Sequence, residues 1–234
     1  MADDYPAGHA TVRHAHRRSQ LFHGTTGMLR VITRDGAWIA PPHRAVWVPG
    51  SIEHQVVCRG AVAFRTLYVE PDASPRLPAV CCVIEMSDLL RALIHQAVVL
   101  PIDYDPAGRD GRVMALILDE LGSAPRSPVH VPMPAARPLR RLCEDFLGDP
   151  ASRAGLDAWA ARAAMSRRTL TRRFRAETGM TIAGWRQQAR LIEALSLMAE
   201  GMPVTAAAFE VGYDSASAFS AAFRRTFGCS PTQY

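Results

Sequence analysis

The order of apolar and polar positions divides the chain at a proline-rich segment near residue 130. Before residue 80, short apolar or alternating runs are separated by Gly, Pro and Asp-Gly sequences, a pattern typical of strands and turns. The predicted strands are 20–22, 27–32, 37–39, 45–48, 54–57 and 62–69. Short strands at this spacing favour an antiparallel barrel or a double-sheet roll.

From residue 87 the apolar positions follow a helical period. Ser87 is placed to cap a helix over 87–99, and a second helix is predicted over 110–122. The apolar stripes run through Leu89, Leu90, Leu93, Ile94, Ala97 and Val98, and through Val113, Leu116, Ile117 and Leu121 beside Glu120. These helices can pack on the barrel or form a dimer interface. Five prolines in 125–138 then indicate a linker.

The last part of the chain is predicted to be entirely helical. Leu139, Leu142, Cys143 and Phe146 mark a first helix that ends at a Gly-Asp-Pro sequence. Further helices are predicted at 156–163, 166–178, 181–200, 203–211 and 215–227. The predicted fold class is therefore α+β with two domains, a β-rich domain over 1–124 and an all-α domain over 137–234, joined by a linker over 125–136.

The sequence from Ser166 to Thr181 is repeated 49 residues later. Matching pairs include Ser166 and Ser215, Leu170 and Phe219, Phe174 and Phe223, and Gly179 and Gly228. Each copy follows a short helix and a tight turn, so we predict two helix–turn–helix motifs, at about 156–177 and 204–227. The connecting helix of roughly 20 residues would span about 30 Å, close to the ~34 Å pitch of B-DNA. An ordinary helical bundle with similar helices is the alternative.

The net positive charge of the chain lies entirely in this helical domain. Residues 1–136 hold 13 Arg and 13 acidic residues, whereas residues 137–234 hold 14 Arg and nine acidic residues, so the net charge of +5 lies entirely in the second part. Within 166–178, Leu170 and Phe174 share the buried side of the helix, and the arginines point elsewhere. Those arginines are Arg167, Arg168, Arg172, Arg173 and Arg175. This distribution favours contact with a nucleic acid.

Other features of the composition indicate the compartment. The five cysteines are odd in number and show no CxxC spacing, which suits free thiols in a reducing cytoplasm. The first 20 residues lack an apolar signal-peptide core, and no apolar run of about 18 residues occurs. We expect a cytoplasmic, nucleoid-associated protein without a membrane partner.

Residues 137–234 resemble the DNA-binding domain of the AraC/XylS family of bacterial transcription regulators. The resemblance is carried by Ala160, Ser166, Leu170, Arg172, Phe174, Glu177, Thr178, Gly179, Gly212, Tyr213, Phe219, Phe223, Arg224, Gly228, Ser230, Pro231 and Tyr234. The N-terminal part resembles the cupin-type barrel of such regulators through His14, His16, Gln20, Leu21, Pro41, Pro42, Ala45, Val46, Trp47, Val48, Pro49 and His54. The resemblance implies double-stranded DNA, an unknown small-molecule effector, a second copy of the chain and RNA polymerase as partners.

The family's base-reading positions fall on Arg168, Thr171 and Arg172, and the resemblance implies that these reach into the major groove. Arg172 is the favoured candidate for a bidentate guanine contact. The corresponding readers in the second motif, Ser217 and Ser220, are short. We therefore predict that the first motif carries most of the base specificity. Phosphate contacts are assigned to Arg167, Arg175, Arg224 and Arg225.

The N-terminal histidines indicate a second candidate site, which could bind a metal. His14 and His16 are two apart and would share one face of a strand, and with His54 they match three ligand positions of metal-binding cupins. Three imidazoles suit Zn, Ni or Fe(II), although Gln20 stands where the usual carboxylate ligand is expected. The alternative is that these residues line an effector pocket or are partly exposed.

Two other functional classes compete with a regulator. A metal-dependent cupin enzyme, such as a dioxygenase or isomerase, would give the basic double repeat no role. A structural adaptor would not need arginines facing outward from the repeat. We therefore expect a regulator without catalytic residues and without a certain cofactor, a divalent metal in the barrel being the one candidate.

Overall fold

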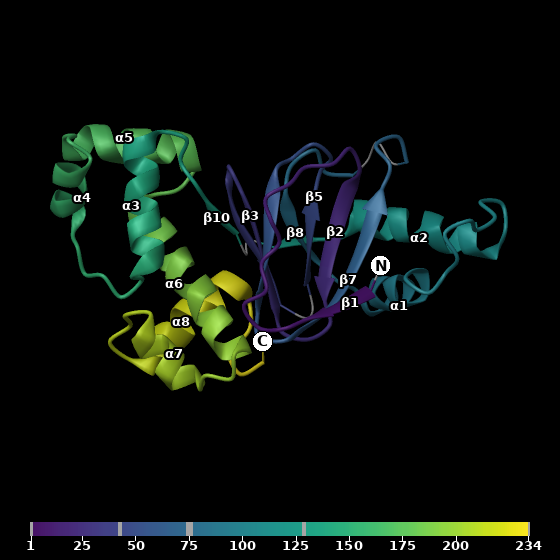
Figure 1. Cartoon of the computed structure of the whole chain (residues 1–234). Coiled ribbons are helices and arrows are strands. Elements are labelled where there is room, and N and C mark those ends of the chain that lie inside the picture. The colour runs from purple at the N-terminus through teal and green to yellow at the C-terminus, as the bar shows by residue number, and fades with distance from the viewer. Residues whose placement is uncertain (1, 42–43, 74–76, 128–129, 234) are drawn as a thin grey trace. The chain divides into compact units, whose positions relative to one another are not determined.

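The computed structural model describes residues 2–41, 44–73, 77–127 and 130–233. The chain divides into two compact units (Figure 1). The N-terminal unit comprises Met1–Thr33 and Trp38–Val129, and the C-terminal unit comprises Arg34–Ala37 and His130–Tyr234. Pro42 and Tyr234, which contribute to the family resemblance, lie outside the described residues. The predicted α+β fold class is confirmed, since antiparallel strands precede a helical region.

The strands of the N-terminal unit form two antiparallel sheets. A six-stranded sheet has the order β1-β7-β2-β5-β8-β9. Its strands are β1 (Ala2–Tyr5), β7 (Val62–Val69), β2 (Ser19–Gly24), β5 (Arg44–Val48), β8 (Cys82–Glu85) and β9 (Arg126–Ser127). The other sheet has the order β4-β3-β6 within this unit, with β4 (Gly36–Ala40), β3 (Met28–Thr33) and β6 (His54–Arg59).

Strand β2 is central in the six-stranded sheet, and both of its faces are covered. It pairs with β5 on one side and β7 on the other, with Leu21 opposite Trp47 and Leu67. Because successive side chains alternate between faces, Leu21 and His23 point one way, and Gln20 and Phe22 the other. The Phe22 ring lies 5.4 Å from the ring of His54 on β6, so the two sheets face each other across these residues.

Helices α1 (Asp88–Ala97) and α2 (Arg109–Ser123) cover the opposite face of the six-stranded sheet. Leu90, Ile94, Ile117 and Leu121 pack there against Leu21 and other residues of the sheet. Ser87 caps α1 by accepting from the Leu90 amide, as predicted. However, the apolar stripes predicted for these two helices included residues that are not buried. Leu89 and Leu116 are 49% and 40% exposed, because each lies at the edge of its stripe rather than over the sheet.

Each of the strands predicted in 1–80 is present, and Val62–Val69 has the predicted bounds. Strands β1, β8 and β9 were missed. The sequence of β1 is Ala-Asp-Asp-Tyr, which lacks an apolar alternation, and this strand lies at the edge of its sheet, where charged residues are common. Strands β8 and β9 follow residue 80, so the sheet extends beyond the predicted barrel region.

Helices dominate the C-terminal unit. They are α3 (Arg137–Gly148), α4 (Leu156–Arg162), α5 (Arg167–Thr178), α6 (Ile182–Ala199), α7 (Val204–Glu210) and α8 (Ala216–Phe227). Phe146, Trp159, Phe174 and Trp185 form an aromatic core, with neighbouring ring centroids 5.9–6.4 Å apart. None of the helices in the described part of the chain has the length and apolar character needed to cross a bilayer.

The described residues of the predicted linker are held in place. Strand β9 pairs with β8 in the N-terminal unit, whereas β10 (His130–Pro132) belongs to the C-terminal unit. There, the Trp185 indole Nε1 donates to Pro132 O at 2.6 Å, and Gln188 Nε2 donates to His130 O at 2.7 Å. Residues 128–129 of this segment lie outside the described residues.

The 49-residue repeat is visible in the backbone of α5 and α8. Ser166 and Ser215 cap the two helices by accepting an amide three residues on. Gly179 and Gly228 end them in the left-handed region, with φ of 73° and 80°, and donate to the carbonyls of Arg175 and Arg224. The same local signals therefore start and stop both helices.

Candidate DNA-binding surface and N-terminal sites

The surface of α5 separates its buried seam from its polar side chains. Leu170 and Phe174 have no exposed surface, so they fix the rotation of the helix against the aromatic core. Arg168, Thr171 and Arg172 are exposed on the other side. Together with Arg175, Thr181 and Ile182 they border one concavity of about 430 Å³. The base-reading residues predicted in the first motif are thus brought together on a single open surface.

The arginines of α5 fall into two groups by their partners. Arg167 forms a two-pronged ion pair with Asp157 on α4, and this pair lowers the pKa of the Asp157 carboxyl and raises that of the Arg167 guanidinium. Arg173 lies 4.0 Å from Glu177, one turn on. Within the described part of the chain, no carboxylate pairs with Arg168, Arg172 or Arg175. These three guanidinium groups remain available to an external anion.

Glu177 also fixes the start of the helical region. Its Oε2 accepts from the Ala136 amide at 2.8 Å, at the N-terminus of α3. The negative charge of a carboxylate at that position suits the helix dipole. Glu177 therefore positions α3 against α5, a role that the sequence pattern did not indicate.

Two arginines of α6, Arg186 and Arg190, have a structural role that was not predicted. Arg186 donates to the carbonyls of Ala154 and Ser152 at 2.7 and 2.6 Å, and its guanidinium lies 4.7 Å from the centre of the Phe146 ring. Burial lowers its pKa. Arg190 donates to Pro150 O at 2.8 Å. Their helical spacing of four was the available signal, since it places both on the side of α6 that faces the α3–α4 loop.

Helix α8 presents a different surface from α5. Phe219 and Phe223 are fully buried, as Leu170 and Phe174 are in α5. Ser217 is exposed and Ser220 is half-buried, so the polar side chains at these positions are short. Arg224 and Arg225 are exposed near the C-terminal end of the helix. The two repeats therefore share their buried seam and differ on their outer face.

Comparison with known proteins agrees with this geometry. Residues 159–234 match the family model described as a helix-turn-helix domain. The chain is 33% identical over 223 residues to the HTH-type transcriptional regulator NimR of Escherichia coli (strain K12), covering 94% of this chain and 81% of that one. The chain belongs to the AraC/XylS family of transcriptional regulators. It is accordingly a DNA-binding protein that regulates transcription.

Further relatives match the C-terminal part of this AraC/XylS-family regulator. The HTH-type transcriptional regulator RipA of Corynebacterium glutamicum is 33% identical over 103 residues, which is 44% of this chain and 31% of RipA. The crystal structure of the DNA-binding domain of AdpA in complex with a target DNA matches 42% of this chain and 90% of that chain, at 34% identity and a TM-score of 0.40.

The N-terminal unit of the regulator brings His14, His16 and His54 together. His14 and His16 lie before β2, in a segment outside the named strands, and not on a strand as predicted. The backbones of His14 and His54 exchange hydrogen bonds of 3.1 and 2.9 Å as a reciprocal antiparallel pair, which places both side chains on one face. One ring nitrogen from each histidine lies within 4.8 Å of those of the others. His54 is 1% exposed, and burial lowers its pKa, which favours the neutral imidazole that metal ligation requires.

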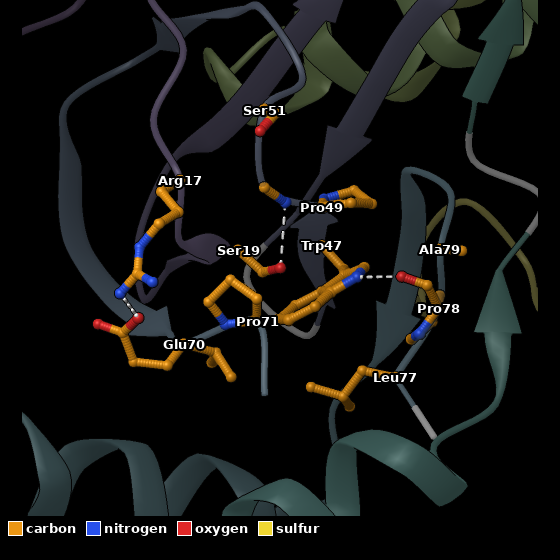
Figure 2. A pocket seen from close by; sticks show the side chains of 12 residues that line it. Arg17, Ser19, Trp47, Pro49, Ser51, Glu70, Pro71, Leu77, Pro78 and Ala79 are labelled. Carbon is orange, nitrogen blue, oxygen red and sulfur yellow. Dashed lines mark hydrogen bonds and ion pairs between the residues drawn. The ribbon is translucent and has the colours of Figure 1, made fainter. Parts of the chain in front are cut away.

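A separate pocket of about 370 Å³ lies in the same unit (Figure 2). Trp47 lines it, with its Nε1 donating to Pro78 O at 2.8 Å. Figure 2 shows the Arg17 side chain reaching the carboxylate of Glu70 at one edge of the pocket. The remaining walls are Ser19, Pro49, Gly50, Ser51, Val69, Pro71, Leu77 and Ala79. The sequence contained no separate signal for this pocket, because its walls come from strand ends and loops that are far apart in the sequence.

Proposed function

We propose that this regulator binds its promoter sites through both helix–turn–helix motifs, and that α5 supplies most of the base specificity. The observation that carries this proposal is the single surface formed by Arg168, Thr171 and Arg172. A bidentate contact from Arg172 to guanine contributes roughly 1–3 kcal/mol of discrimination. The short Ser217 and Ser220 side chains of α8 contribute less base selection.

The other arginines serve affinity rather than selection. Arg175, Arg224 and Arg225 contact phosphates, which fix the register of the protein without reading the sequence. Arg167 was also predicted to contact a phosphate. It forms an ion pair with Asp157, so it can contact a phosphate only after that ion pair breaks. Helix α6 has 18 residues and spans about 27 Å, which suits motifs that enter neighbouring major-groove segments.

Genome-wide mapping of bound DNA tests this function. The wild-type chain should enrich a limited set of promoters that share a sequence. A variant with Arg168→Ala and Arg172→Ala should lose this enrichment while keeping its fold, as judged by its thermal melting. Arg109→Ala, at an exposed position on α2, is the matched control and should enrich the same promoters. Unchanged enrichment by the double variant would contradict the assignment of α5.

The N-terminal region 1–124 is proposed to sense a small molecule and to signal through 125–136 to the DNA-binding region 137–234. The pocket of Figure 2 is the proposed effector site. Its volume falls within the range of small-molecule pockets, and it combines apolar walls with a few polar groups. The Arg17–Glu70 pair at its edge can reorganise to meet a polar substituent.

A filled pocket tests the effector site. Ala79→Trp should occupy the cavity and abolish the thermal stabilisation that an effector gives the wild-type protein. Ala107→Trp, in an exposed turn outside the pocket, is the control and should leave that stabilisation unchanged. If the effector stabilises both variants equally, the effector binds outside this pocket.

The regulator is further proposed to act in the cytoplasm as a homodimer, with RNA polymerase as a transcriptional partner. Leu89 on α1 and Leu116 on α2 are exposed, and Val99 and Ile102 between the helices are 72% and 95% exposed. Apolar residues exposed in one region are typical of an interaction surface. We therefore assign self-association to these two helices.

A divalent metal at His14, His16 and His54 is the proposed cofactor, held for sensing or stability rather than for catalysis. The residues fit such an ion because the buried His54 Nε2 has no hydrogen-bond partner among the described residues. Metal analysis of the purified chain tests this, and a DNA shift assay separates a regulator from a metal-dependent cupin enzyme. Turnover without specific DNA binding would favour the enzyme.

A further inference from the structure

The hydrogen bonds around the three histidines direct one nitrogen of each ring toward a common point. The Nδ1 atoms of His14, His16 and His54 lie 2.9, 2.7 and 2.8 Å from the backbone carbonyls of Val12, Arg18 and Ile52, respectively. A carbonyl oxygen only accepts, so each Nδ1 carries the proton. Each Nε2 then has a free lone pair, the arrangement usual in metal-bound histidines.

Gln20 reaches the same point from β2. Its side chain is buried, and its Oε1 lies 2.7 Å from the Nε2 of His16. The orientation of the amide follows from Thr66, whose hydroxyl donates to Leu21 O at 3.0 Å. The Thr66 oxygen must therefore accept from Gln20 Nε2, also at 3.0 Å. The carbonyl oxygen of Gln20 is thereby turned toward the histidines.

With His16 in its neutral form, this arrangement is one donor short. His16 faces carbonyl oxygens with both ring nitrogens, and a neutral imidazole has a single N–H. A cation between Nε2 of His16 and Oε1 of Gln20 resolves the mismatch, because both atoms then act as lone-pair donors. We infer that Gln20 Oε1 is the fourth ligand of the metal site, and that Thr66 is the residue that positions it.

This inference rests on the proposed metal site, and it specifies the charge of that site and its full set of ligands. Three imidazoles and an amide oxygen are all neutral, and the histidine group includes no Asp or Glu among the described residues. The site suits divalent ions that accept nitrogen and oxygen ligands. Two ligands bound at about 2.1 Å in a tetrahedral site lie about 3.4 Å apart. The histidine nitrogens, which lie within 4.8 Å of one another, would therefore draw closer together when an ion binds.

Cobalt binding to the full-length protein tests the role of Gln20. Co²⁺ is titrated into the wild-type chain while its visible absorption is recorded, and the Kd is obtained by competition with a chelator. Gln20→Leu should weaken binding by at least 10–100-fold and alter the spectrum, whereas Gln20→Glu should tighten binding. Gln55→Leu is the matched control, because Gln55 lies on β6 with its amide donating to Thr11 O at 2.9 Å, outside the cluster.

Thr66 is tested by a pair of variants. Thr66→Val removes the hydroxyl that orients the amide and should weaken Co²⁺ binding by about 10–100-fold, whereas Thr66→Ser should restore it. If His54→Ala abolishes binding while Gln20→Leu and Gln20→Glu keep the wild-type Kd and spectrum, the metal site stands and the role of Gln20 is overturned. If the folded wild-type chain binds no Co²⁺, the metal proposal itself is overturned along with this inference.

Discussion

In both helix–turn–helix motifs, the tight turn requires a residue with a positive φ, and the two motifs have different residue types at that position. Ala164 and Gly212 precede the recognition helices, with φ of 51° and 84°. A left-handed conformation costs a residue with a Cβ atom roughly 1–2 kcal/mol. Ala164 accepts this cost, whereas a Cβ at position 212 would also lie 2.8 Å from the Cα of Ala151.

The two turns therefore give opposite predictions for the effect of exchanging alanine and glycine on the free energy of unfolding. Ala164→Gly should raise the free energy of unfolding by up to about 1 kcal/mol, since part of the relieved strain is offset by the greater freedom of glycine when unfolded. Gly212→Ala should lower it by about 2 kcal/mol or more, because strain and a backbone clash add. Denaturant unfolding measures both, and a loss of stability in Ala164→Gly would contradict the assigned strain.

His23 makes the stability of the N-terminal unit depend on pH. Burial lowers its pKa to about 4, and Arg65, Arg91 and His95 add positive charge nearby. The unfolded chain takes up a proton near pH 6.5, but the folded chain does so only near pH 4. Stability should therefore fall as the pH is lowered through this interval, by about 3 kcal/mol from this residue.

The corresponding variants are His23→Gln and, as a control, His9→Gln, a half-exposed residue that is not among the groups acting on His23. Unfolding free energies measured from pH 7 to 4.5 should decline less steeply for His23→Gln than for the wild-type chain. The burial-lowered pKa values of His54 and His130 leave part of the slope in place. A slope unchanged by His23→Gln, or changed equally by His9→Gln, would contradict this attribution.

Arg172 and Arg224 are predicted to act on DNA in distinguishable ways. Arg172→Ala should weaken binding to a selected site by roughly 1–3 kcal/mol and barely affect binding to unrelated DNA. Arg224→Ala should weaken binding to both and lower the salt-dependence slope by about 1. Binding titrations at several salt concentrations measure these effects, and an unchanged slope for Arg224→Ala would remove it from the phosphate contacts.

At the scale of elements, the helices of the C-terminal unit were predictable because local signals agreed with the packing. Ser166 and Gly179 define the ends of α5, and the pair Leu170 and Phe174 defines its buried seam. The same signals recur in α8. In the N-terminal unit, alternation was sufficient for β7. Strand β1 has one large side chain, Tyr5, and is held by pairing with β7. Pairing of this kind is a long-range effect that a local pattern does not contain.

The functional sites show the same difference between what local sequence signals predict and what long-range packing determines. The surface of α5 could be predicted because its residues lie on one helix, where spacing fixes direction. The ion pair of Arg167 with Asp157 could not, since it depends on how α4 packs against α5. Likewise, the sequence placed Gln20 beside the histidines only by resemblance, and its contact with His16 depends on the hydroxyl of Thr66 across the β2–β7 pair.

At the scale of the whole molecule, we propose that two copies of the chain associate through α1 and α2. We predict that a variant with Leu89→Glu and Leu116→Glu sediments as a monomer at micromolar concentration, because each change places a charge on the proposed apolar surface. The wild-type chain should sediment as a dimer under the same conditions. A monomeric wild-type chain would contradict the assignment of α1 and α2 to self-association.

One of the two similar motifs is proposed to read most of the DNA sequence. Selection of binding sites from random DNA measures this directly, with the wild-type chain, Arg172→Ala, and a variant carrying Ser217→Ala and Ser220→Ala. We predict that Arg172→Ala loses base preference across one half of the selected site, whereas the double serine variant keeps nearly the wild-type preference. Equal loss of preference in both variants would contradict the account.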